Sequence, residues 1–269
     1  MIRWAYIRLV WRNHRTFAIF SMLFITLFQF LILYLVKTFD TEAMLSAVLE
    51  QMPPMMKAFL QDSFFSMLNY NGAAAFGFNH PIVLTLLVLI AINIPVHQIS
   101  RELESGTLEL LLAHPFKRSS LLTSLWFSGL MILFVIILIA LCGSYTSIIL
   151  FHTLTPVIFI RLMEICLNLW LIMVLIFTYT LLIGVFSKMG IKAGNISAAL
   201  TFFFYLSYFI AELWDKISFT KPFNIFTYYQ PQKIMLNQGH YALDILILFI
   251  LVVLSFVISL RKFQRRDVP

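Results

Sequence analysis

Charged residues are scarce in this chain. Asp, Glu, Lys and Arg make up 12% of its 269 residues, whereas hydrophobic residues make up 61%. A soluble domain has about 25% charged and roughly 45–50% apolar residues, so this composition excludes an ordinary soluble domain. Several apolar runs reach about 20 residues, the length of a membrane-spanning helix and about twice that of a barrel strand. The sequence therefore predicts an all-α polytopic membrane protein.

Cysteines and catalytic motifs are also lacking. Cys142 and Cys166 are the only cysteines, and neither belongs to a CxxC pair, which argues against a disulfide framework or a zinc site. We interpret both as small packing side chains. The sequence has no G-x-x-x-x-G-K-[ST], HExxH or GxSxG motif, so we expect no enzyme activity, no ATP site and no other cofactor in this chain.

Six apolar segments are long enough to cross a bilayer. The predicted spans are 17–37, 81–99, 119–144, 157–187, 192–212 and 241–260. The third and fourth are separated because Gly143, His152 and Pro156 supply a turn within one long uncharged run. Segments 38–80 and 213–240 are expected outside the membrane, and residues 1–269 form a single domain.

The basic residues predict the orientation of these spans. If the N-terminus is cytoplasmic, 13 of the 19 Lys and Arg residues lie on the cytoplasmic side. The external ones are then Lys37, Lys57, Arg161, Lys216, Lys221 and Lys233. This asymmetry follows the positive-inside rule and predicts a multi-pass protein of the cytoplasmic (inner) membrane with both termini cytoplasmic. The net charge of +7 flanks apolar runs, which indicates lipid headgroups and no nucleic acid as its partner.

Residues 1–16 have the pattern of an amphipathic helix. Arg8, Arg12 and Arg15 share one face, and apolar residues occupy the opposite one. This favours a helix that lies in the inner membrane interface. Arg3 does not fit the pattern, so a plain cytoplasmic start to the first span is the alternative.

One charged stretch, RELESGTLELLLAHPFKR, interrupts the apolar sequence at residues 101–118. Ser105 or Thr107 can cap a short helix, and Pro115 ends it. Leu108, Leu111 and Leu112 then share a face, which gives the helix an apolar stripe on the cytoplasmic side. The stripe either folds back onto lipid and the ends of the spans or docks in a cleft of a soluble protein.

The same stretch resembles the cytoplasmic loop of type-2 ATP-binding-cassette permeases, in which an arginine and glutamates precede Gly-Thr, Glu-Leu-Leu and Pro-x-x-Arg. The resemblance implies a coupling helix that inserts into a separate nucleotide-binding ATPase subunit, which would hold ATP and Mg²⁺. It assigns ATPase docking to Arg101, Glu102, Glu104, Gly106, Thr107, Leu108, Glu109, Leu111, Leu112, Pro115 and Arg118. His114 departs from the family pattern, which has a small residue there.

The family also implies a partner and a range of functions. A second permease subunit, most simply an identical one, would complete the transporter. Within the family, Gly-Thr-Leu-Glu-Leu-Leu-Leu is most similar to permeases of nitrous-oxide reductase maturation and of gliding motility. The rival hypothesis is an ATPase-coupled component of assembly or signalling that transports nothing, for example in maturation of a copper enzyme.

Three further groups carry two interpretations each. Arg161, Glu164 and Asn168 either line a transport path or form an interfacial ion pair with a neighbouring amide. Asn93 and His97, on either side of Pro95, indicate a hinge or a simple proline kink. Met52, Met55 and Met56 suit Cu(I), although methionines on interfacial helices usually serve packing.

Overall fold

The computed structural model describes residues 3–38, 70–101, 118–151, 156–187 and 190–265, which are helical almost throughout and contain no strand. Six helices in these ranges are long and apolar enough to cross a membrane. They are Trp4–Thr38, Tyr70–Ile99, Arg118–Phe151, Pro156–Phe186, Ile191–Leu213 and Tyr241–Gln264. The predicted all-α polytopic fold is confirmed.

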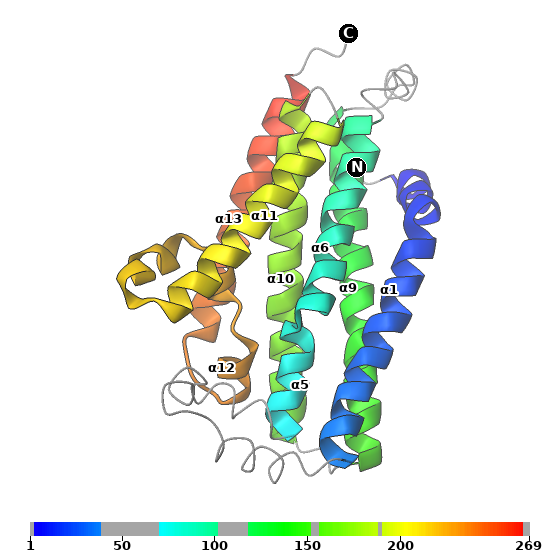
Figure 1. The fold of residues 1–269 in the computed structure, drawn as a ribbon. Helices are drawn as coiled ribbons and strands as arrows, with labels where there is room; N and C mark the ends of the chain where they lie inside the picture. The colour runs from blue at the N-terminus through cyan, green and yellow to red at the C-terminus, as the bar shows by residue number, and fades with distance from the viewer. Residues whose placement is uncertain (1–2, 39–69, 102–117, 152–155, 188–189, 266–269) are drawn as a thin grey trace.

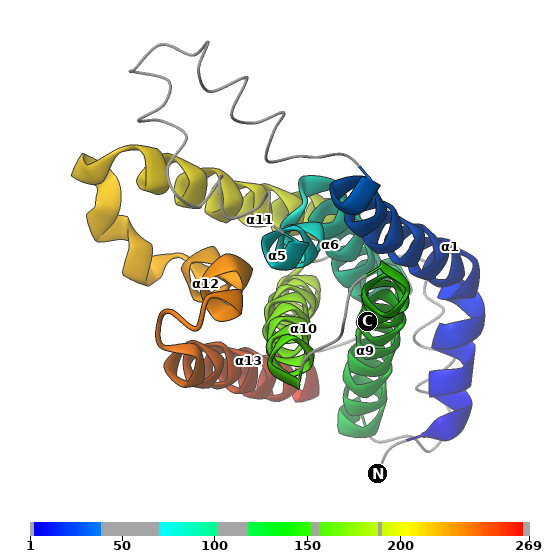
Figure 2. The same cartoon turned by 90° about the horizontal axis from the view of Figure 1, so that it is seen from below.

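Helix α10 (Pro156–Phe186) forms the centre of the bundle. In its most apolar window 78% of the residues are buried, against 17% in α11 (Gly190–Leu213) and in α13 (Tyr241–Gln264). Figure 2 shows α10 surrounded by α5, α9, α11, α12 and α13. From Leu171 to Leu181 every residue of α10 is buried, which suits a helix that is apolar on every side.

Helix α1 (Trp4–Thr38) packs along α9 (Arg118–Phe151) through a single stripe. Its buried residues are Tyr6, Val10, His14, Ala18, Ser21, Met22, Ile25, Gln29 and Leu33, at spacings of mostly three or four. The two helices come very close at Gly143 of α9, where an added Cβ would meet the backbone carbonyl of Thr26. Glycine is therefore required at this crossing.

The first turns of α1 run across the axis of the bundle. They are seen end-on in Figure 1 and lengthwise in Figure 2. A helix of 35 residues is about 52 Å long, well beyond the ~30 Å of a hydrocarbon core, so part of α1 must lie outside it. The helix nevertheless continues without a break through residue 16, where the sequence suggested a boundary between an interfacial helix and a span.

The second span consists of α5 (Tyr70–Asn79), α6 (Pro81–Pro95) and the π-helix η1 (Val96–Arg101). His80 interrupts it in an extended conformation (φ −65°, ψ 134°), as expected for a residue before proline. Helix α6 begins at the predicted start of the span, residue 81, and α5 adds a further helix before it. Residues 70–79 form a helix because Ala73, Ala74, Ala75 and Phe78 are buried against the bundle.

The other boundaries lie closer to expectation, with one exception. The third span, expected to end at residue 144, continues to Phe151 because Gly143 serves a helix contact rather than a turn. The fourth and fifth helices differ from 157–187 and 192–212 by one or two residues at each end, and the sixth begins at residue 241 as predicted and ends four residues beyond 260.

The two ends of the bundle differ in composition. The start of α1, the end of η1, the start of α9 and the end of α13 lie at one end, here called the terminal end (Figure 1). The opposite end, here called the α12 end, carries η2 (Asp215–Phe223), η3 (Ile225–Tyr228) and α12 (Pro231–Met235). Within the ranges that the structure describes, all four acidic residues lie toward the α12 end. They are Glu164, Glu212, Asp215 and Asp244.

Candidate functional site

At the terminal end of the bundle, the second span finishes in an irregular helix. Pro95 closes α6, and the next six residues, Val96–Arg101, form the π-helix η1. Proline has no N–H to donate, so it interrupts the α-helical ladder at this point. A π-turn inside a helix is rare and frequently marks a functional position. The backbone of η1, which leads into residue 102, therefore lacks the regular α-helical hydrogen bonds of α6.

Helix α1 holds this π-helix from the side. The Tyr6 hydroxyl donates to Oε1 of the buried Gln98 at 3.4 Å. The rings of His14 and His97 meet edge to face, with centroids 5.4 Å apart. His14 is 9% exposed, and its Nε2 has no hydrogen-bond partner. The first turns of α1 and η1 thus form one polar junction.

The start of α9 is tied to the same part of α1. The backbone N–H of Arg3 donates to Oγ of Ser124 at 2.8 Å. Ser124 is buried and lies close to the beginning of α9 at Arg118. Both helices that border residues 102–117 are therefore connected through the first turns of α1.

The predicted docking residues fall mostly outside the described ranges. Arg101 is the last residue of η1, and Arg118 is the first of α9. The predicted coupling helix lies outside the described residues. So do the remaining docking residues, which are Glu102, Glu104, Gly106, Thr107, Leu108, Glu109, Leu111, Leu112 and Pro115. Met52, Met55 and Met56 also lie outside them.

Arg161 and Glu164 form the expected ion pair near the α12 end. Arg161 Nη1 lies 2.6 Å from Glu164 Oε2, and the two side chains are 22% and 23% exposed. Arg161 also donates through Nη2 to Oδ1 of Asn237 at 2.6 Å. Asn237 has a positive φ of 58°, a conformation that asparagine tolerates well. The pair therefore fastens the segment after α12 to α10.

Asn168 contacts the same segment between α11 and α13. It is fully buried, and its Nδ2 donates to the carbonyl of Tyr228 at 3.0 Å. Arg161 and Asn168 thus connect one face of α10 to residues 214–240. Among the described side chains, those of His, Cys, Asp and Glu form no group of three that could hold a metal.

Asn93 and His97 are not brought together. His97 is half-buried beside His14, whereas Asn93 is exposed on the surface of α6. Thr85 and Leu89 are exposed on the same face, at spacings of four residues. Figure 2 shows α5 and α6 between α1 and α11. The partly polar face of α6 therefore has α1 on one side and α11 on the other.

Sequence reasoning missed several buried polar groups. Gln29 is fully buried in α1, and its Oε1 accepts from Ser144 Oγ at 3.4 Å. Tyr229 is buried at the α12 end, where its hydroxyl donates to the Phe78 carbonyl at 3.0 Å and burial raises its pKa well above the usual value. For Gln29 a signal was available, because it lies four residues from both Ile25 and Leu33 on the buried stripe.

Comparison with known families gives one finding. A family model described as "ABC-2 family transporter protein" matches residues 8–268, nearly the whole chain. A search of curated proteins gives no match to the chain.

Proposed function

The chain belongs to the ABC-2 family of transporter proteins and is a permease component of an ABC transporter; from this premise we propose that residues 102–117 couple it to a separate ATPase subunit. That subunit would bind ATP and Mg²⁺. The observation that carries the proposal is the polar junction between α1, η1 and the start of α9, which borders both sides of this stretch.

The junction gives a route for movement. When the ATPase subunits close on ATP, a docked coupling helix is pushed along with them. Its displacement reaches η1 directly through the backbone, and reaches α1 through the contacts of Gln98 and His97. A π-turn can absorb such a shift by changing register, which moves α6 relative to its neighbours.

A second copy of the chain would complete the transport path. Thr85 lies about halfway along the span Tyr70–Ile99, and with Asn93 it exposes polar groups on a face that would otherwise contact lipid. Polar groups in hydrocarbon are costly unless they face protein or a water-filled cavity. We therefore place the path between two copies at the exposed face of α6, between α1 and α11.

Membrane position is part of the same proposal. The terminal end would be cytoplasmic, because the ATPase and its ATP are there and because exposed arginines cluster on the first turns of α1. The α12 end would then be external. The finer similarity to permeases of nitrous-oxide reductase maturation and gliding motility stays a prediction from the charged stretch.

Leu111→Asp tests the coupling assignment. The substitution removes roughly 1.5–3 kcal/mol of side-chain burial and adds the cost of desolvating a charge. A loss of about 4 kcal/mol weakens docking roughly a thousandfold. The variant should reach the membrane at normal level yet fail to co-purify with its co-expressed ATPase subunit, and hydrolysis of ATP by the complex should be lost.

Leu110→Asp is the matched control, because residue 110 lies off the stripe of Leu108, Leu111 and Leu112 at helical spacing. It should retain the ATPase. Glu104→Ala, expected at the rim, should cost far less than Leu111→Asp, since exposed ion pairs contribute about 0–1 kcal/mol. Wild-type co-purification of Leu111→Asp would contradict the assignment, and equal losses at 110 and 111 would show a general intolerance of charge.

A further inference from the structure

A groove lies on the side of the bundle formed by α9 and α10, away from the face assigned to transport. Its volume is about 410 Å³, within the roughly 300–1,000 Å³ of typical ligand pockets. Its walls come from α9 and α10, and Tyr241 adds the first residue of α13. The lining is almost entirely apolar, so the groove suits a hydrocarbon chain better than water.

The length of the groove matches one membrane leaflet. Along α10 it extends from Phe159 to Trp170, a distance of about 16 Å at the rise of an α-helix. Half of a hydrocarbon core of about 30 Å is about 15 Å. The groove starts near the α12 end of α10 and ends close to the middle of the helix, so it covers the depth of an acyl chain in that leaflet.

An aromatic pair lies at each end of the groove. At the deep end, Phe134 and Trp170 meet edge to face at 5.9 Å, and Trp170 Nε1 donates to the Leu130 carbonyl at 3.1 Å. At the shallow end, Phe159 stacks on Tyr145 at 5.0 Å, and the Tyr145 hydroxyl donates to the Phe159 carbonyl. These contacts hold Trp170 and Phe159 in place at the two ends of the groove.

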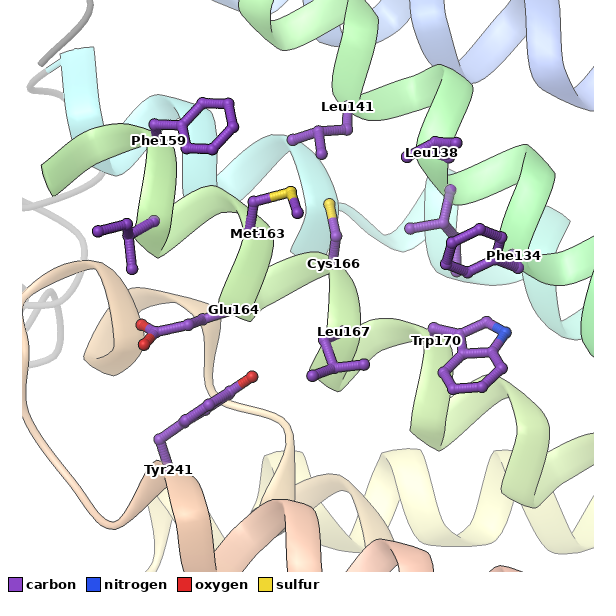
Figure 3. A pocket seen from close by; sticks show the side chains of 12 residues that line it. Phe134, Leu138, Leu141, Phe159, Met163, Glu164, Cys166, Leu167, Trp170 and Tyr241 are labelled. Atoms are coloured by element: carbon purple, nitrogen blue, oxygen red, sulfur yellow. The ribbon is translucent and has the colours of Figure 1, made fainter. Parts of the chain in front are cut away.

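The polar groups gather at one side of this apolar space. Figure 3 shows Glu164 on α10 with Tyr241 reaching toward it from α13. A carboxylate and a phenol therefore line the groove. The guanidinium of Arg161 lies just outside the lining, 2.6 Å from Glu164, and is partly exposed. Charges at this depth are costly, and a ligand with complementary charges would lower that cost.

We propose that the groove binds a membrane phospholipid with a primary-ammonium headgroup, as in phosphatidylethanolamine. One acyl chain fills the space between Leu138 and Leu167. The ammonium donates hydrogen bonds to Glu164, and the phosphate accepts them from Arg161. A zwitterionic headgroup matches an adjacent carboxylate and guanidinium, whereas phosphatidylglycerol has no cation and phosphatidylcholine has a cation without N–H donors. This site does not depend on the coupling proposal.

Native mass spectrometry of the purified protein, loaded from micelles with equal amounts of the three lipids, tests the proposal. The wild type should retain phosphatidylethanolamine in preference to the other two. Glu164→Gln should reduce that preference about tenfold, the effect of one lost charge-assisted hydrogen bond. Equal retention of the three lipids by the wild type, or an unchanged preference in Glu164→Gln, would overturn the headgroup assignment.

A steric variant tests the chain site separately. Leu138 is 42% exposed and lines the groove, so Leu138→Trp should fill it without disturbing the core and should abolish retention of lipid. Leu23→Trp is the control, since Leu23 is 67% exposed on α1, outside the groove. If the Leu138→Trp variant retained as much lipid as the Leu23→Trp variant, the proposal would be contradicted. Thermal melting checks that both variants fold.

A photoreactive benzophenone side chain at position 138 identifies the occupant directly. In vesicles containing phosphatidylethanolamine, the cross-linked product should gain the mass of one phospholipid. A product with the mass of two chains would place a second copy of the protein on this surface, and the lipid site would be excluded.

Discussion

Single glycines set the distance between helices in this bundle. An added Cβ at Gly129 of α9 would collide with the ring of Phe177, which is fully buried in α10 and has no room to move. At Gly194 of α11 the nearest atoms to an added Cβ are side-chain carbons of Val96, 3.7 and 3.8 Å away, which is ordinary contact. The same residue type therefore has different consequences at the two positions.

These two glycines make a matched pair of substitutions. Gly129→Ala should destabilise the protein by about 1–3 kcal/mol, the usual cost of overpacking a core. Gly194→Ala should be neutral or stabilising by up to about 1 kcal/mol, because alanine is the better helix former. Thermal unfolding in detergent measures both. A Gly129→Ala variant as stable as the wild type would show that α9 and α10 can separate at this point.

Residue roles were only partly predictable from the sequence. The ion pair of Arg161 and Glu164 follows from its i, i+3 spacing, and the structure contains it. Its contact with Asn237 and the contact of Asn168 with Tyr228 join segments 76 and 60 residues apart, and no local pattern encodes them. Periodicity shows which face a residue occupies, but not which element will cover that face.

Among the elements, the segment between α11 and α13 forms hydrogen bonds to both α11 and α5. Asn224 Nδ2 donates to the Phe204 carbonyl at 2.6 Å and to Ser207 Oγ at 2.8 Å, both on α11. Tyr229 donates to the Phe78 carbonyl of α5. That carbonyl belongs to the last turn of α5, where helical donors are missing because the chain breaks at His80. The break therefore creates the acceptor that the segment uses.

Tyr229→Phe should loosen this segment. It leaves the buried Phe78 carbonyl without the tyrosine donor, at a cost of about 1–3 kcal/mol. Hydrogen exchange of backbone amides in residues 225–236 should become faster. Tyr228→Phe is the control, because the Tyr228 hydroxyl donates to Pro222 within the same segment at an exposed site. Equal exchange in the two variants would show that Tyr229 is held by packing alone.

Helix boundaries show what the sequence could and could not provide. The number of spans follows from hydrophobic length alone, and it is correct. The helices extend beyond the predicted spans at two boundaries: a further helix, α5, precedes residue 81, and α9 continues past residue 144 to Phe151. In a bundle of closely packed helices, Gly143 serves contact with Thr26, and Pro81 follows a one-residue interruption between two helices.

At the scale of the whole molecule, the charges predict how the bundle sits in the membrane. Its described acidic residues lie toward the α12 end, and the exposed Arg8, Arg12 and Arg15 lie near the terminal end. In a variant lacking Cys142 and Cys166, a cysteine at position 105 should react with a membrane-impermeant maleimide only after the cells are opened. A cysteine at position 221 should react in intact cells. External labelling at position 105 would contradict the orientation and the coupling proposal with it.

The contact of Tyr229 with Phe78 also constrains how the protein is made. Its partners are 151 residues apart, so the ribosome releases α5 long before Tyr229 is synthesised. The Phe78 carbonyl is therefore without this partner while α6, α9, α10 and α11 are added. Docking of residues 215–235 onto α5 is therefore a late step of biogenesis.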